Sequence, residues 1–88
     1  MYIINIKPKL DKIFLKLSRK SPKTLKIIHN KIQEVIQNPM HYKNLRKPIH
    51  QLKRVHMRKS FVLTFSVNEE TKTVTFEDYD HHDNIYLK

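Results

Sequence analysis

The chain has 88 residues, with no cysteine, no glycine and a formal net charge of +10. This length suits one small domain over residues 1–88, and the composition excludes disulfides, zinc–thiolate sites and glycine-rich phosphate loops. No apolar run could span a bilayer, so we expect no membrane association, and the lack of cysteine suits a reducing cytoplasm. The positive charge indicates a polyanionic partner: nucleic acid, an acidic protein or an anionic membrane surface.

The first half of the chain predicts a strand followed by two helices. Residues Tyr2–Ile6 are typical of a short strand. Pro8–Leu17 carries apolar residues at helical spacing, and Ser21–Pro22 is a typical start for a second helix. Asn38–Pro39 ends that helix, because the residue before a proline avoids helical backbone angles. Two helices joined by a short loop predict an antiparallel helical hairpin.

The second half predicts three strands. Gln51–Met57, Phe61–Val67 and Thr73–Tyr79 alternate apolar and polar residues, so each has one face that can pack on helices. Between the helices and these strands, Met40–His50 is basic and irregular, and we expect Leu45 and Ile49 to hold it against the edge of the domain. The order of elements predicts an α+β fold, in which the N-terminal strand and helical hairpin pack on one face of an antiparallel sheet and leave the other face open.

The lack of glycine also predicts which residues adopt a positive φ. Turns that need this conformation must fall to asparagine or aspartate, or be avoided, and Asn38, Asn44 and Asn68 lie where the predicted elements end.

The open face of the sheet carries the candidate site. If Leu63 and Phe65 face the helices, Val62 on the same strand faces outward. The preceding strand then presents three basic residues on the same outer face: Arg54, His56 and Arg58. We expect the C-terminal residues to meet this strand there: His81, His82 and Tyr86.

These residue types suit cleavage of a phosphodiester in RNA. Histidine can act as general acid or base near neutral pH, arginine binds phosphate through two donors, and tyrosine can stack on a base. We therefore assign catalysis to Arg54, His56, His81, His82 and Tyr86. We assign RNA binding to Lys53, Arg58, Lys47 and Arg46.

Other interpretations of the same residues remain open. The basic strand is equally typical of a solvated surface without a binding function. Tyr86 is equally typical of an aromatic residue that packs on the sheet. His81–Asp83 is a poor metal site, because neighbouring side chains on an extended chain point to opposite sides. We therefore expect no metal and no other cofactor.

Three segments resemble the RelE/ParE superfamily of toxin–antitoxin toxins, and the resemblance covers nearly the whole chain. The family pattern has an Arg-x-Arg strand, a Tyr-Arg-hydrophobic-hydrophobic-Tyr strand and a His-Arg-x-x-Ile-Tyr ending. Here these segments are Arg54–His56, Phe61–Phe65 and His81–Tyr86. The resemblance implies a metal-independent, ribosome-associated mRNA endonuclease, cytoplasmic and neutralised by a cognate antitoxin.

The sequence departs from this pattern at three positions. Val62 stands where the family has a phosphate-binding arginine, while His56 and His82 replace two further arginines. The histidines can still supply charge or acid–base function, whereas Val62 cannot. The alternative is therefore a non-catalytic, ParE-like inhibitor of DNA gyrase, or a nucleic-acid-binding protein on the same fold.

Overall fold

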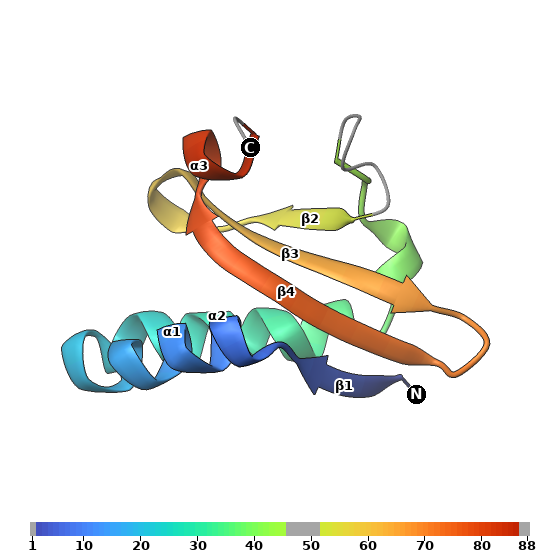
Figure 1. The fold of residues 1–88 in the computed structure, drawn as a ribbon, viewed down its shortest axis with the longest axis horizontal. Coiled ribbons are helices and arrows are strands. Elements are labelled where there is room, and N and C mark those ends of the chain that lie inside the picture. Colours follow the sequence, from blue (N-terminus) through green and yellow to red (C-terminus); the bar gives the residue numbers. More distant parts are fainter. Residues whose placement is uncertain (1, 46–51, 87–88) are drawn as a thin grey trace.

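A helical hairpin covers one face of a four-stranded sheet in the computed structural model, which describes residues 2–45 and 52–86 (Figure 1). The elements in chain order are β1 (Ile3–Ile6), α1 (Pro8–Lys20), α2 (Pro22–Val35), η1 (Pro39–His41), β2 (Lys53–His56), η2 (Arg58–Ser60), β3 (Phe61–Asn68), β4 (Thr73–His81) and α3 (His82–Tyr86). The strand order across the sheet is β1-β4-β3-β2. No helix in the described ranges is long and apolar enough to cross a membrane.

Both predicted helix starts are confirmed. Pro8 and Pro22 lie in the first turns of α1 and α2. Ser21 is the N-cap of α2, but its hydroxyl hydrogen-bonds the Thr24 hydroxyl at 2.8 Å and caps no backbone N–H. The turn between the helices is thus closed by two side chains and by the Ser21 N–H donating to the Leu17 carbonyl.

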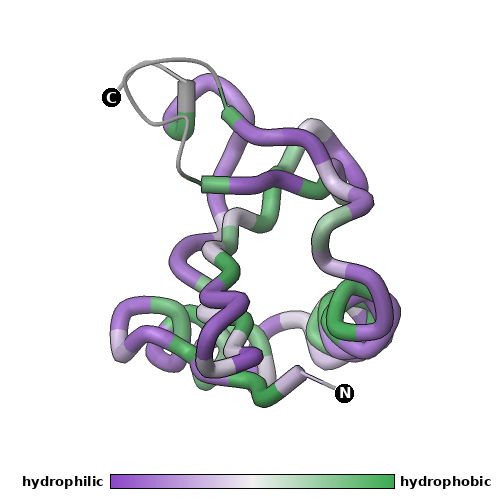
Figure 2. The backbone as a smooth tube through the Cα atoms, turned by 90° about the vertical axis from the view of Figure 1, so that its right-hand side faces the viewer, coloured by the Kyte–Doolittle hydropathy of each residue, from purple (hydrophilic) through white to green (hydrophobic). Residues whose placement is uncertain are grey.

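The main core lies between the helical hairpin and the sheet. The inward-facing strand residues Leu63 and Phe65 are fully buried, as the alternation predicts. The helices contribute Leu10, Phe14, Ile28, Ile32, Val35 and Ile36, and the strands contribute Val55, Leu63, Phe65, Val74, Phe76 and Tyr79. Green and purple alternate along the tube in Figure 2, because each helix and strand buries only one of its sides.

The sheet is mixed. Strands β2, β3 and β4 are antiparallel, as expected, whereas β1 pairs with β4 in parallel, from Ile3 opposite Thr73 to Ile6 opposite Phe76. Parallel neighbours need a long crossover connection, and here the intervening helices and strands supply it. Because β1 ends at Ile6, it covers only the first half of β4, and the start of α1 lies along the second half.

The expectation that the outer face of the sheet is open is wrong around Val62. That side chain is 0% exposed and packs with Leu45, Ile85 and the partly buried Leu52 in a second apolar cluster. Leu45 therefore holds its segment to the domain as predicted, whereas Ile49 lies outside the described residues. The cluster forms because α3 folds back over the sheet, which brings Ile85 onto β3 (Figure 1).

Positive φ falls on other residues than the predicted asparagines. Among the described residues it occurs at Lys59, Ser60 and Lys72, with φ of 57°, 64° and 54°. Asn68 instead organises the β3–β4 turn through its side chain, whose Oδ1 accepts the N–H groups of Glu70 at 3.0 Å and Thr71 at 3.2 Å. The asparagine acts as a side-chain acceptor, and the left-handed position falls to the lysine at the end of the turn.

Candidate functional site

The pairing of β2 with β3 places Arg54 and His56 on the outer face of the sheet. Arg54 lies opposite Thr64, and His56 lies opposite Val62. Residues paired directly across two antiparallel strands point to the same face, and Val62 belongs to the outer cluster. The predicted orientation of these two basic residues is therefore confirmed.

His82 reaches His56 from the C-terminal end of β4. The two imidazole rings stack with their centroids 6.0 Å apart and an interplanar angle of 24°. His82 is the first residue of α3, so the chain has already left the sheet and can lay this ring over the end of β2. The Asp83 carboxylate lies 3.5 Å from Nδ1 of His82, and both imidazoles are partly open to solvent.

His81 lies on the other face of the sheet, so the expectation that it meets Arg54 is wrong. It is paired with Phe61, whose ring contacts the His81 imidazole edge-on at 5.7 Å and stacks on Tyr79 at 4.9 Å. Phe61 and Tyr79 belong to the main core under the helices. Strand β4 continues through His81, so the alternation of side chains along the strand places this residue on the inner face. His82 follows the end of the strand and is not bound by that alternation.

Arg54 is held at its tip but retains bonding capacity. Its Nη1 donates to the Asn44 carbonyl at 3.4 Å. Its Nε is buried and has no acceptor among the described residues. A buried donor without a partner is costly. The Arg54 side chain therefore lies on the face that carries the histidine pair, and its guanidinium is fixed by the Asn44 carbonyl.

Lys53 is occupied with structural hydrogen bonds. Its ammonium donates to the Tyr42 carbonyl at 3.0 Å and to Asn44 Oδ1 at 2.9 Å. These bonds tie the segment after η1 to the edge of β2, where Asn44 also forms a β-bridge with Lys53. Lys53, which we predicted to bind RNA, thus connects the segment after η1 to β2 in this structure.

The other predicted basic residues do not join this face within the described residues. Arg58 lies in η2 and lines a hollow on the helix side of the sheet, so its predicted outer position is wrong. Strand β2 ends at His56, so the chain has left the strand before it reaches Arg58. Arg46 and Lys47 lie outside the described residues, as does the side chain of Tyr86, which ends α3.

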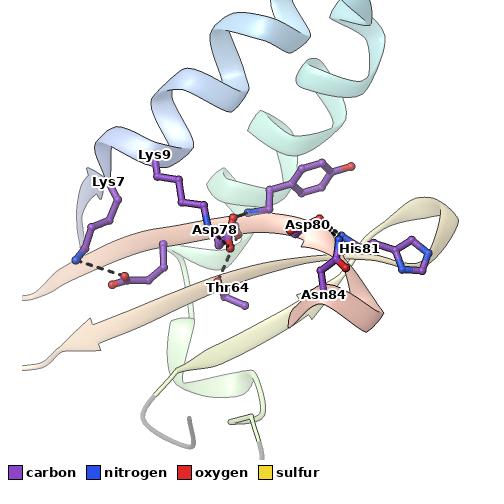
Figure 3. Close-up of polar contacts among 9 residues, drawn as sticks. Lys7, Lys9, Thr64, Asp78, Asp80, His81 and Asn84 are labelled. Carbon is purple, nitrogen blue, oxygen red and sulfur yellow. Dashed lines mark hydrogen bonds and ion pairs between the residues drawn. The ribbon is translucent and has the colours of Figure 1, made fainter. Parts of the chain in front are cut away.

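Polar side chains missed by the sequence reasoning hold the end of β4 in place (Figure 3). Asp80 Oδ1 accepts the N–H of His81 at 2.7 Å and the side-chain amide of Asn84 at 3.0 Å. Asp80 lies in β4 and Asn84 in α3, so this contact depends on the point where the strand ends, which no local spacing in the sequence indicates. These bonds start α3 and thereby set the position of His82.

Two ion pairs join the start of α1 to the second half of β4 (Figure 3). Lys7 lies 3.5 Å from Glu77, and Lys9 lies 3.0 Å from Asp78. Asp78 Oδ1 also accepts the Tyr79 N–H at 2.9 Å, and the Thr64 hydroxyl donates to the Asp78 carbonyl at 3.4 Å. The acidic residues near the histidines therefore serve the fold, and in the described ranges no group of three or more His, Asp or Glu is arranged to hold a metal ion.

Comparison with known proteins finds relatives in sequence and solved structures with the same fold. No protein-family model matches the chain. A Methanocaldococcus jannaschii protein named "Putative toxin RelE4" is 60% identical over 88 residues, which is 100% of this chain and 94% of that protein. An "Uncharacterized protein" of Methanosarcina mazei is 54% identical over 86 residues, covering 98% of this chain and 100% of that protein.

Solved structures share the fold at low sequence identity. The toxin–antitoxin complex RelBE of E. coli matches with a TM-score of 0.74 and 18% identity, covering 92% of this chain and 96% of that chain. The YoeB–YefM complex from Staphylococcus aureus matches with a TM-score of 0.77 and 11% identity, covering 93% and 98%. The α+β arrangement described above is therefore the arrangement found in those chains.

Proposed function

This chain belongs to the RelE family, whose members are the toxins of toxin–antitoxin modules, and we propose that it is an mRNA endonuclease held inactive by its cognate antitoxin. Its target is mRNA engaged on the ribosome, which places its action in the cytoplasm. Residues 1–88 act as one RelE-like toxin domain. The observation that carries the proposal is the stacked pair of His56 and His82, on the same face of the sheet as Arg54.

The histidine pair supplies the two proton transfers that RNA cleavage needs. One imidazole takes the proton from a ribose 2′-hydroxyl, and the 2′-oxygen forms a bond to the neighbouring phosphorus. The phosphorus–5′-oxygen bond breaks, and the other imidazole, entering as imidazolium, gives its proton to the leaving oxygen. The products are a 2′,3′-cyclic phosphate and a 5′-hydroxyl. The proton count balances without a cofactor.

Arg54 stabilises the charge that develops on the phosphate. The negative charge on the non-bridging oxygens grows as the 2′-oxygen attacks, so a fixed guanidinium donor binds the transition state more strongly than the substrate. The hydrogen bond to the Asn44 carbonyl fixes the guanidinium of Arg54, and the remaining N–H groups of its two Nη atoms are the donors proposed for the phosphate. Tyr86, at the end of α3, is proposed to stack on or orient a nucleotide at the same site.

A specific observation favours the second candidate function, a non-catalytic inhibitor on the same fold. Val62 is fully buried beneath Ile85 and Leu45, at the position where the family pattern has an arginine. This chain therefore has no cation at that point of the outer face. In this reading the toxin blocks its target by binding, as the ParE-like branch does with DNA gyrase.

The deciding experiment is inducible expression followed by primer extension on cellular mRNA. Cleaved transcripts are expected for the native chain. His56→Ala and His82→Ala should each lower cleavage by about a hundred- to ten-thousand-fold, the usual contribution of a general acid or base. The double variant should lose little more, because groups that act as a unit are not additive.

Controls separate loss of chemistry from loss of fold. Lys12→Ala removes an exposed cation on α1 and should leave cleavage unchanged. Circular dichroism should show native helix content for all variants. Growth arrest without cleaved mRNA, together with inhibited DNA supercoiling, would instead establish the gyrase reading.

A further inference from the structure

A hollow lies on the helix side of the sheet, near the turn that joins α1 to α2. We call it the helix-end groove. Its volume is about 400 Å³. Its walls come from both layers, with Leu17 and Ile27 on the helices and Met57 and Phe61 on the sheet. Figure 1 shows the sheet rising away from the helices toward this end.

Three exposed cations line the same groove: Lys23 at the start of α2, and Arg58 and Lys59 in η2. None of the ion pairs among the described residues involves any of them. Lys59 and Ser60 both have left-handed backbone angles, which are unfavourable for residues other than glycine. The connection between β2 and β3 thus keeps two cations at the groove at a conformational cost.

The groove is separate from the proposed catalytic face. His56 and His82 lie on the outer side of the sheet, whereas the groove opens between the inner side and the helices. Phe61 belongs to the groove, and its neighbour Val62 belongs to the outer cluster. A molecule in the groove would therefore leave the histidine pair and Arg54 uncovered.

We propose that the helix-end groove is a docking site for an apolar segment of the cognate antitoxin that carries carboxylates beside its apolar residues. The inference rests on the proposed function for the identity of the partner. Apolar walls fit apolar side chains, and the three cations fit flanking acidic groups. A second copy of this chain fits poorly, because it brings the same +10 charge. An RNA backbone offers little to the apolar walls.

Docking at this site has a functional consequence. The antitoxin gains affinity away from the catalytic face, so binding and inhibition become separable. A toxin with a damaged groove should still cut mRNA but escape its antitoxin. A toxin with a damaged histidine pair should still bind its antitoxin with native affinity.

The test uses the purified product of an adjacent gene that forms a complex with the native chain, and measures its binding to toxin variants by calorimetry. The double charge reversal Lys23→Glu/Lys59→Glu should raise Kd by about tenfold or more and flatten its dependence on salt. Ile27→Asp, which places a charge on the apolar wall, should raise Kd further. The two lysines are exposed, so the double variant tests the groove even if Ile27→Asp fails to fold.

The matched control is Lys12→Glu/Lys16→Glu, which makes the same change in net charge on the exposed side of α1. Native affinity is expected for it. Equal weakening by both double variants, or native affinity for the groove variant, would overturn the proposal. A groove variant that binds antitoxin normally but changes RNA binding or oligomeric state would assign the groove to RNA or to a second copy.

Primer extension on the same variants keeps this inference distinct from the proposed function. The groove variant should cleave mRNA at the native level even when antitoxin is co-expressed. If the native chain cuts no mRNA, the binding comparison still decides whether the antitoxin docks in the groove.

Discussion

Replacing Val62 by arginine restores the residue that the family pattern has at this position, yet we expect it to damage this protein. Val62 is fully buried, and its neighbours Leu45 and Ile85 are 2% and 4% exposed. An arginine there must either bury its charge in the apolar cluster or push α3 off the sheet. In neither case does it regain an ordered phosphate site.

The cost can be worked out from this cluster. Losing a buried valine forfeits about 1.5–3 kcal/mol, and displacing Ile85 forfeits a similar amount. Val62→Arg should therefore lower the free energy of unfolding by about 3–6 kcal/mol, out of a total of about 5–15 kcal/mol for a typical domain. For a domain of this size that corresponds to a fall in Tm of at least about 12 °C.

Thermal unfolding followed by circular dichroism, with primer extension on the same variant, tests this reasoning. Val62→Thr is the matched control: it keeps the shape and buries one hydroxyl, so it should cost only about 1–3 kcal/mol. If Val62→Arg unfolds at the native temperature and cleaves mRNA faster than the native chain, the arginine has reached the substrate and our account of the cluster is refuted.

Three further outcomes follow from the packing and the titrating groups. Phe65→Ala, in the centre of the main core, should destabilise the fold by about 3–5 kcal/mol in urea denaturation, and a native midpoint would contradict its burial. Burial raises the pKa of the Tyr79 hydroxyl in the folded state. The contribution of this neutral hydroxyl to stability is therefore present below the unfolded-state pKa near 10, and it is lost as pH rises through the folded-state pKa. Tyr79→Phe should therefore lose less stability than the native chain between about pH 8 and pH 11, and equal losses would refute this. The hydrogen bond from the Tyr2 hydroxyl, followed by that from Lys72, lowers the pKa of Glu69, so this contribution is present above the unfolded-state pKa and lost as pH falls through the folded-state pKa. Tyr2→Phe should raise the Glu69 pKa in an NMR titration, and an unchanged curve would exclude the hydroxyl as the cause.

Local sequence patterns were enough for the elements and for part of the site. Helical spacing and proline positions predicted α1 and α2, and alternation predicted that Leu63 and Phe65 face inward. Alternation also oriented Arg54 and His56 correctly. These features depend on residues a few positions apart, whose geometry is set by the repeat of a single helix or strand.

Contacts between distant segments decided the rest. His81 and His82 are neighbours in sequence, and only the point where β4 ends separates them: pairing with Phe61 keeps His81 on the inner face, while α3 carries His82 to His56. Val62 has an outward-facing position in its strand but is buried, because Leu45 and Ile85 arrive from far along the chain. Alternation assigns a side chain to a face of the sheet, whereas its exposure there depends on what the remainder of the chain packs against that face.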